Sequence, residues 1–482
     1  MTASPIAAST AVPNAAPRDA ALDALRGLAV LGMVLSGSVA FGGVLPAWMY
    51  HVQVPPPLHK FLPEVAGIGW VDLVFPFFLF CQGAAIPLAA AGPPAALRQV
   101  LLTATRRGLL IAGLALFYFQ LRPGPKAPWG EGADAALAIT AFALLCLALT
   151  RRPGGAGHGA LVVRAVRVSA LAASAALLLA LPALRGEAFD PKRSDIILMV
   201  LANMAFFGTL IFHVTRERPL WRLALLPLLL AVYAAGGQPG SPAQAVMQAT
   251  PLPWLYQFNF MKYLLIVVPG MFFGEWLLRQ RTHPVDLSDP GAGPRPSPMA
   301  AVALLSLALV VLNTTLLYTR QLGLNMVATV VGLALLAALL RRADAMTRYI
   351  AAASGWLLVL GLLIEPLQGG IHKDPATASY FFVTAGMAGF SLLALQHLHG
   401  LPLGSALAWL RGRLAEVGRN PLVAYTAGAL LLTPLLKLTG LYPLWSGLNQ
   451  TATQGLLRGL IFTAVVAALT IVFTRRGWLW KT

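Results

Sequence analysis

The chain has 482 residues, of which 58% are hydrophobic and only 11% are charged. A soluble globular protein is typically about one quarter charged, so this composition excludes a water-soluble fold and indicates an integral membrane protein with many spans. The formal net charge of +18 comes without basic patches interleaved with aromatic residues, which argues against nucleic acid as a partner and for topology-setting charge in the loops.

Residues 1–17 are rich in Ala, Pro, Ser and Thr and show no periodicity, which predicts a disordered tail. Four charged residues between Arg18 and Arg26 then lie at helical spacing before an apolar run. Basic residues at the foot of a first span indicate that the N-terminus is cytoplasmic. Because the composition indicates an integral membrane protein, the lipid bilayer is the first expected partner of residues 18–482.

A helix needs about twenty predominantly apolar residues to cross a bilayer. On that rule the sequence predicts an all-α, polytopic transmembrane helix bundle with about 11–14 spans. The segments 222–236 and 324–340 are short, and either could be re-entrant or part of a tilted helix. The fourteen candidates are 27–47, 70–91, 103–121, 133–150, 168–184, 195–214, 222–236, 260–279, 299–319, 324–340, 349–364, 378–397, 421–438 and 456–474.

Alternation of these spans from an inner N-terminus puts most Lys and Arg residues in inner loops and leaves the acidic residues unbiased, in agreement with the positive-inside rule. Pro- and Gly-rich inner loops are expected over 153–158 and 284–298. We expect one membrane domain over 18–482, in which the second loop could join sub-bundles 18–283 and 299–482.

The stretch from Leu58 to Ala89 carries the most informative polar residues. Asp72 lies near the start of a long apolar segment and Gln82 lies inside it, where a charge is costly unless it has a partner or a function. His59 precedes them in a Pro-rich outer loop, and an imidazole beside a carboxylate can accept and return a proton. The alternative is structural: His59 lies at headgroup level, while Asp72 caps the helix or pairs with Lys60.

A second outer loop carries Glu365, His372, Lys373 and Asp374, which form either another wall of a site or an ordinary polar turn. The outer loops are also rich in Trp and Tyr, as an interfacial belt or a sugar-stacking surface would be. Inner arginines that could bind phosphate through their planar guanidinium, or only set topology, are Arg98, Arg106, Arg107, Arg411, Arg413 and Arg419.

Asn420 precedes Pro421 and is expected to cap a span. Cys81 and Cys146 lie in apolar segments and have no metal-binding spacing, so we expect no metal. The chain contains no GxSxG, Walker or strand-linked GxGxxG motif, which leaves acyl-serine, nucleotide-hydrolysing and Rossmann functions without support.

Several segments resemble the heparan-alpha-glucosaminide N-acetyltransferase family, and its bacterial branch most closely. The likeness is dense over ALDALRGLAVLGMVL at 21–35, Leu58-His59, and WVDLVFPFFLFCQGAAIPLA at 70–89. Segments 257–277 and 369–386 look like later parts of that family. The resemblance implies a multi-pass protein of a bacterial inner membrane that takes acetyl-CoA from the cytosol and acetylates a sugar acceptor on the far side.

The resemblance also implies roles for particular residues. The catalytic histidine of the family matches His59 best, with His51 as the other choice, and the familiar Asp matches Asp72. Asp23 and Arg26 match the first-span pair. Contacts to acetyl-CoA are expected from Arg26, Arg98, Arg106, Arg107 and Asn420, and contacts to the acceptor from Trp70, Glu64, Gln82, His372, Lys373 and Asp374.

The residues leave other functions open. A secondary transporter for a sugar or amino sugar could use Asp72, Gln82 and Glu365 near the midplane, although no inverted repeat is visible. A third hypothesis is that the protein is a scaffold for the assembly of envelope glycans. The sequence also leaves room for a homodimer.

Overall fold

The computed structural model describes residues 18–124, 128–151, 158–282, 296–398, 401 and 404–481. Within these ranges the fold is an all-α bundle, as predicted, and the one sheet has two short antiparallel strands that pair Thr150 with Trp480 and Arg151 with Leu479. The expected tail over 1–17 and most of the two expected Pro- and Gly-rich inner loops lie outside the described residues.

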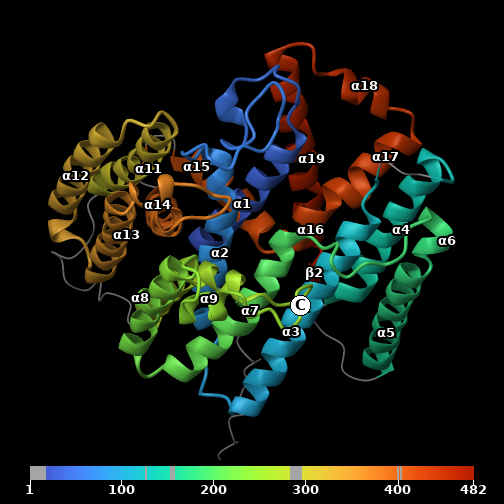
Figure 1. The fold of residues 1–482 in the computed structure, drawn as a ribbon, viewed down its shortest axis with the longest axis horizontal. Helices are drawn as coiled ribbons and strands as arrows, with labels where there is room; N and C mark the ends of the chain where they lie inside the picture. Colours follow the sequence, from blue (N-terminus) through green and yellow to red (C-terminus); the bar gives the residue numbers. More distant parts are fainter. Residues whose placement is uncertain are drawn as a thin grey trace, which may run out of the picture.

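The elements alternate between long helices and short turns (Figure 1). They are α1 (Ala20–Ser38), η1 (Ala47–Met49), α2 (Trp70–Ala89), α3 (Leu97–Leu121), α4 (Glu131–Leu149), β1 (Thr150–Arg151), α5 (His158–Leu179), α6 (Leu181–Arg185), α7 (Ile196–Thr215), α8 (Pro219–Ala235), α9 (Pro242–Met247), η2 (Phe258–Tyr263), α10 (Leu264–Thr282), α11 (Pro296–Tyr318), α12 (Leu322–Leu339), η3 (Leu340–Arg342), α13 (Ala345–Leu363), η4 (Leu367–Gly369), α14 (Ala378–His397), α15 (Gly404–Gly418), α16 (Pro421–Ala427), the π-helical η6 (Gly428–Leu432), α17 (Thr433–Leu438), α18 (Tyr442–Gly447), α19 (Ala452–Arg475) and β2 (Leu479–Trp480).

Thirteen of the described helices are long and apolar enough to cross a membrane. The one predicted span outside these thirteen is the segment expected over 222–236, which is α8 and has only 17 residues. Its two ends nevertheless reach opposite ends of the bundle: Arg222 in its first turn pairs with Glu275 near the end of α10 at 2.7 Å, and Tyr233 near its end bonds to the backbone of Ala376. The described helices therefore keep the predicted order, in which the fourteen spans cross the bundle in alternating directions.

Two predicted spans are displaced at both ends, and α3 begins at Leu97, six residues before the predicted start of its span. The first span was expected over 27–47, but α1 begins at Ala20, where the Asp19 carboxylate accepts the Leu22 N–H at 2.8 Å and caps the helix. It ends at Ser38, because the apolar residues that follow belong to a loop. The segment expected over 168–184 is α5, which begins ten residues earlier at His158, ends at Leu179 and is followed by the short helix α6.

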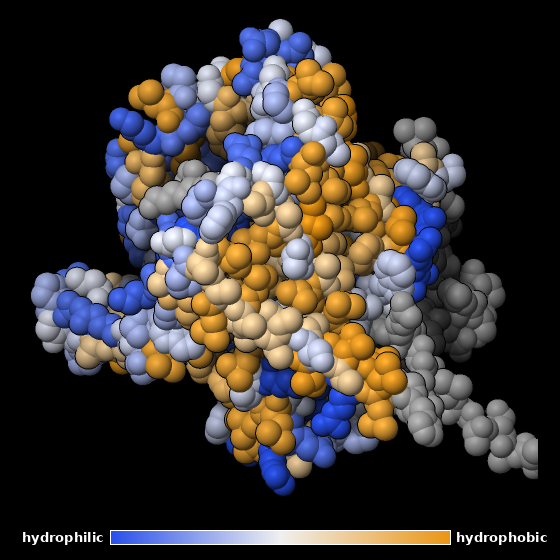
Figure 2. Space-filling view, turned by 90° about the vertical axis from the view of Figure 1, so that its right-hand side faces the viewer, coloured by the Kyte–Doolittle hydropathy of each residue, from blue (hydrophilic) through white to orange (hydrophobic). Residues whose placement is uncertain are grey.

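The alternating helices define two faces of the bundle. We call the face with the loops 39–69 and 364–377 the site face. We call the opposite face, which carries Arg18, Arg98 and Arg216, the arginine face. In the view of Figure 2, apolar residues cover the middle of the molecule and polar residues gather toward its ends, as expected of a protein in a lipid bilayer.

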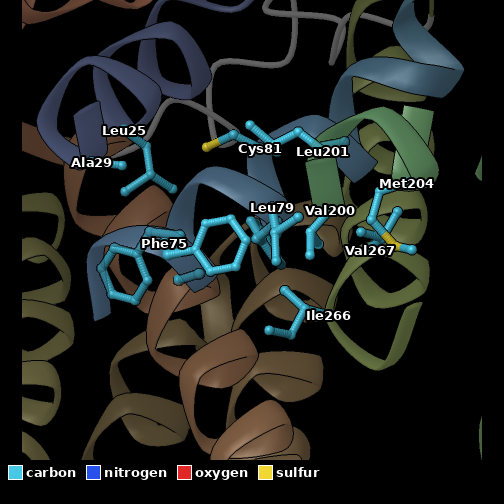
Figure 3. Close-up of a cluster of buried hydrophobic side chains, with 14 of the residues drawn as sticks. Leu25, Ala29, Phe75, Leu79, Cys81, Val200, Leu201, Met204, Ile266 and Val267 are labelled. Carbon is cyan, nitrogen blue, oxygen red and sulfur yellow. The ribbon is translucent and has the colours of Figure 1, made fainter. Parts of the chain in front are cut away.

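Close contact between glycine-bearing helices builds the centre of the bundle. A methyl group on Gly83 of α2 would meet the Val267 carbonyl of α10, and one on Gly274 of α10 would meet the carbonyl of Ala84. Small residues let helix backbones approach in a membrane, where packing replaces the hydrophobic effect as the driving force. Figure 3 shows the apolar side chains of α1, α2, α7 and α10 that surround this contact.

The two halves of the chain pack as one body. The first-half helix α1 contacts α15 and α19, and α2 and α10 contact α14, in which every residue from Ala378 to Leu395 is buried. This arrangement fixes the first turn of α2 between a loop from each half of the chain.

We expect Gly274→Leu to destabilise the bundle by about 1–3 kcal/mol or more, because the new side chain would collide with the α2 backbone. The matched control is Gly113→Leu on α3, where no atom lies within 4 Å of an added methyl group. Thermal unfolding in detergent would measure both. Equal melting temperatures for the two variants would contradict the packing described for α2 and α10.

Candidate functional site

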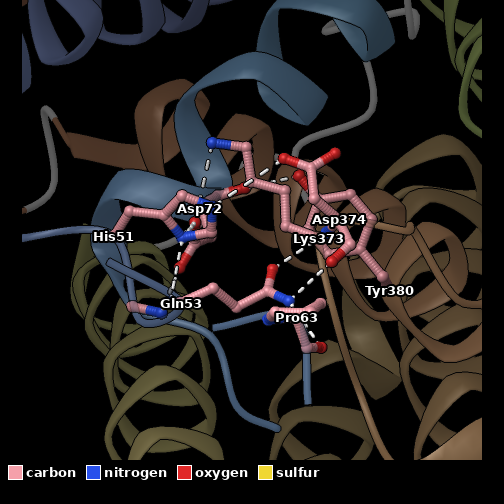
Figure 4. Close-up of polar contacts among 8 residues, drawn as sticks. His51, Gln53, Pro63, Asp72, Lys373, Asp374 and Tyr380 are labelled. Carbon is pink, nitrogen blue, oxygen red and sulfur yellow. Dashed lines mark hydrogen bonds and ion pairs between the residues drawn. The ribbon is translucent and has the colours of Figure 1, made fainter. Parts of the chain in front are cut away.

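Two loops that are far apart in the sequence meet on the site face. The Gly67 N–H donates to the Ile371 carbonyl at 2.8 Å, and the side chain of Gln53 bonds to the backbone of Asp374. This contact places polar residues of the 39–69 loop directly beside those of the 364–377 loop. Figure 4 shows the resulting cluster at the start of α2.

Asp72 lies at the centre of this cluster in the first turn of α2, with none of its surface exposed. Its Oδ2 accepts the Gly69 N–H at 2.9 Å, so the predicted capping role is real. Its Oδ1 lies 2.8 Å from His51 Nδ1 and 3.7 Å from Lys373 Nζ. A buried carboxylate needs such partners, because an uncompensated charge out of water costs several kcal/mol (about 3–5 kcal/mol when one partner of a buried pair is removed).

The other residues of the cluster hold Asp72 and His51 in place. The hydroxyl of Tyr380 on α14 donates to the backbone carbonyl of Asp72 at 2.8 Å and ties α14 to α2. Asp374 Oδ2 lies 3.8 Å from His51 Nε2. Two acidic side chains therefore flank one imidazole, and one ammonium lies beside the buried acid.

His51 has the geometry of a proton acceptor. Its Nδ1 faces the Asp72 carboxylate, which favours the tautomer with a proton on Nδ1 and leaves the Nε2 lone pair free. Nε2 has no hydrogen-bond partner among the described residues, and 18% of the side chain is exposed. Burial opposes protonation of the ring, but contacts with the Asp374 and Asp72 carboxylates outweigh burial and the charge of Lys373, so the pKa of His51 is raised above its ordinary value.

The expected pairing of His59 with Asp72 is not formed, because the His59 ring is used within its own loop. Its Nε2 accepts the Gly42 N–H at 3.0 Å and its Nδ1 lies 3.3 Å from the Val54 carbonyl. The ring also packs edge-on against Phe41 and Tyr50. His51, the alternative histidine, takes the place beside Asp72.

The expected acceptor contacts fall into different places. Lys373 and Asp374 belong to the cluster, whereas both ring nitrogens of His372 face backbone carbonyls, those of Gly370 at 3.0 Å and Glu64 at 3.4 Å. The Glu64 side chain is exposed.

The remaining two expected contacts, Trp70 and Gln82, lie at different depths along α2. Trp70 begins α2 and packs against the buried loop cluster of Val39, Leu45, Met49 and Tyr50. Gln82 lies ten residues beyond Asp72, about 15 Å along α2, and its amide donates to the Leu201 carbonyl at 2.9 Å. It therefore joins α2 to α7 at another depth from the cluster.

A cavity of about 300 Å³ adjoins the cluster and extends between the helices. Lys373 lines it from the site face, and the lining from the first turns of α2 includes Val71 and Phe75. Tyr425, whose hydroxyl donates to the Asp195 carboxylate at 3.0 Å, lines it from α16, just before the π-helical segment η6. The cluster is therefore next to a space that could hold a small molecule.

Cationic residues gather toward the arginine face. Arg26 pairs with Asp23 at 2.9 Å, and its guanidinium also donates to the carbonyls of Gly418 at 3.3 Å and Cys81 at 3.4 Å. Arg18 and Arg107 lie within electrostatic range of Arg26, and Arg419 within range of Arg18. Asp23 lies near Arg18 and Arg26, and Asp19 caps the first turn of α1 beside Arg18. The four arginines outnumber these two acids, so they form a concentration of positive charge that suits a phosphate-bearing ligand. We call these four residues the arginine cluster.

The other residues expected to bind acetyl-CoA differ in their exposure and in whether their side chains are already hydrogen-bonded. Arg98 and Arg106 are exposed on α3. Arg107 also lines a groove of about 600 Å³ between α2, α3 and α7. Asn420 is fully buried, and its amide is taken by the backbone of Trp478 at 2.9 Å and Trp480 at 3.1 Å, so it neither caps α16 nor is free to bind a ligand.

Two residues of the cluster carried no signal in the sequence. Gln53 is an amide in a Pro-rich loop, and Tyr380 is one aromatic residue in a continuous apolar helix. Their partners, Asp374 and Asp72, are more than 300 residues away. No local pattern could have indicated either contact.

Comparison with known sequences identifies one family. A family model described as a domain of unknown function, DUF5009, matches residues 18–277, which is more than half of the chain. The match includes His51, Asp72 and Arg26, and it ends before the 364–377 loop. No curated protein matches the chain.

The raised pKa of His51 leads to a measurable pH dependence. Diethyl pyrocarbonate modifies only the neutral imidazole, so labelling of His51 should increase with pH around a midpoint above the ordinary histidine value of about 6.5. Asp374→Asn removes one of the two carboxylates that favour protonation, and the midpoint should fall. Mass spectrometry of the labelled peptide gives both values. A midpoint that is the same in Asp374→Asn would show that this carboxylate does not act on His51.

Proposed function

We propose that this chain, which belongs to the DUF5009 family, is a transmembrane acyltransferase that moves an acetyl group from acetyl-CoA to an amine or hydroxyl of a sugar. Many apolar helices make it a multi-pass membrane protein, and the positive-inside bias supports a cytosolic arginine face and an external site face. The resemblance to the heparan-alpha-glucosaminide N-acetyltransferase family supports the choice of donor and acceptor. A bacterial inner membrane is the proposed location.

One observation carries the proposal: a buried carboxylate orients an imidazole whose second nitrogen makes no hydrogen bond among the described residues and has only the Asp374 carboxylate near it, at 3.8 Å. This is the arrangement by which a histidine acts as a general base in acyl transfer. His51 Nε2 would take the proton from the acceptor as its nitrogen or oxygen attacks the acyl carbon. Asp72 would stabilise the imidazolium that forms.

The same nitrogen would complete the reaction. A thioester supplies an activated acyl carbon, whose bond to sulfur breaks as the bond to the acceptor forms. The proton held on Nε2 then passes to the departing thiolate, so that His51 returns to its neutral form. A two-step route, in which Nε2 itself is acylated and then attacked by the acceptor, would use the same atom and the same carboxylate.

Lys373 supports a meeting point for the two substrates. It lines the cavity beside the cluster and lies 3.7 Å from Asp72. An ammonium group in a partly dry cavity can stabilise negative charge that develops on an acyl oxygen. We therefore assign Lys373 the electrophilic role and Asp374 the role of a second partner for His51.

The arginine cluster supports entry of the donor from the other face. Arg26 contacts the Cys81 carbonyl, which lies nine residues beyond Asp72, or about 14 Å along α2. A phosphate-bearing head group held by Arg26, Arg107 and their neighbours would remain on the arginine face, while a flexible arm reaches between the helices toward His51. The two ends of the proposed site are therefore separated by about half of a typical 30 Å hydrocarbon core.

Acetyl transfer is testable in proteoliposomes supplied with labelled acetyl-CoA on one side and glucosamine on the other. We expect His51→Ala to lower the rate by about 10²–10⁴-fold, because a general base typically contributes that much. His59→Asn is the matched control, since Asn tolerates the positive φ of 48° found at His59. It should retain activity.

Two outcomes would contradict the proposal. Full transfer by His51→Ala would remove the proposed base. Uptake of glucosamine into vesicles that lack any acyl donor, without acetylation, would instead favour a transporter.

A further inference from the structure

Gln53 is a fully buried amide two residues after the proposed base. Its Oε1 accepts the Asp374 N–H at 2.9 Å, and its Nε2 donates to the Asp374 carbonyl at 2.6 Å. Nε2 also donates to the Pro63 carbonyl at 3.0 Å. One side chain thus makes with a distant backbone the pair of bonds that residues of two antiparallel strands exchange.

The backbone that Gln53 holds carries two of the charges around His51 and Asp72. The Asp374 carboxylate lies 3.8 Å from His51 Nε2, and the Lys373 ammonium lies 3.7 Å from Asp72 Oδ1. Both side chains are partly exposed, at 56% and 25%, so their own packing does not fix them. The backbone of Asp374 is the rigid point from which both extend.

We infer that Gln53 is a positioning residue, whose amide holds Asp374 and Lys373 at their places around His51 and Asp72. Its backbone N–H lies 3.4 Å from His51 Nδ1, a contact that a side-chain substitution leaves in place. Its side chain touches no reacting atom, and it acts through the loop that it fixes. The catalytic consequence rests on the proposed function, whereas the effect on the surroundings of His51 does not. Misplacement of catalytic groups by about 1 Å can cost about 100-fold in rate, so this restraint matters for chemistry.

The chain offers a closely matched control. Gln120 at the end of α3 is also buried, and its Nε2 donates to the carbonyls of Asp190 at 3.0 Å and Arg193 at 3.3 Å. Its Oε1 accepts the Asp190 N–H at 3.4 Å. It therefore makes the same kind of paired contact with a loop that carries none of the proposed catalytic residues.

The test compares Gln53→Met with Gln120→Met in the full-length protein. Methionine keeps the length of the side chain and adds no charge, so any change at His51 reports the lost hydrogen bonds. The first measurement is the pH midpoint of His51 labelling by diethyl pyrocarbonate. The second is the kcat and KM of acetyl transfer.

We expect the labelling midpoint to fall in Gln53→Met and to remain unchanged in Gln120→Met. Transfer should show a kcat lowered by about 10- to 100-fold in Gln53→Met, with an unchanged KM for the donor, which binds at the other face. An unchanged midpoint in Gln53→Met, or the same fall in Gln120→Met, would overturn the inference. Should Gln53→Met fail to fold, Gln53→Asn gives the same readout, because its shorter amide cannot reach both groups.

The labelling measurement tests the positioning role of Gln53, and the transfer measurement tests the proposed acyltransferase function, so the two claims can fail separately. A wild-type protein that transfers no acetyl group would refute the proposed function. The fall of the midpoint in Gln53→Met would still decide whether Gln53 positions the charges around His51.

Discussion

The candidate site depends on a single buried negative charge. Asp72 lies in the first turn of α2 without contact with solvent, and α2 is itself packed inside the bundle. A carboxylate at such a position is stable only when other groups supply hydrogen bonds and positive charge. Gly69 supplies the first, and His51 and Lys373 supply the second. Because these partners come from loops more than 300 residues apart, the charge also specifies how the two halves of the chain meet.

The fold was largely predictable because hydropathy is a local property. The span expected over 378–397 is α14 to the residue, and the expected span over 70–91 begins with α2 at Trp70. Errors occurred where apolar residues continue past a helix, as at the end of α1, since composition alone does not distinguish a buried loop from a helix. The 17 residues of α8 show the same limit, because its crossing is visible only through its contacts.

The site was only partly predictable, because its geometry is long-range. An acid at the edge of an apolar helix drew attention to Asp72, and the charges of the 364–377 loop drew attention to Lys373 and Asp374. The choice between two histidines of one loop could not be made from spacing. It depends on His59 being held by Gly42 and on His51 being turned toward Asp72. Proximity in the sequence favoured His59, which does not contact Asp72 in the fold.

The proposed reaction joins two ends of one helix bundle. The site face holds an oriented imidazole and a cavity that Lys373 lines, and the arginine face holds cations near Asp23. Each end has an ordinary structural explanation by itself, as a buried ion pair or as topology-setting charge. Their separation of about 14 Å along α2 is what makes a substrate that reaches from one to the other plausible on physical grounds.

The central claim is that a donor enters from the face opposite to His51. A structure determined by electron cryomicroscopy in lipid nanodiscs, with a non-hydrolysable acetyl-CoA analogue, tests this claim directly. We expect phosphate density at Arg26 and Arg107, with the acyl end directed toward His51 Nε2. Nucleotide density on the face that carries His51, or an arginine cluster without density at saturating analogue, would contradict it.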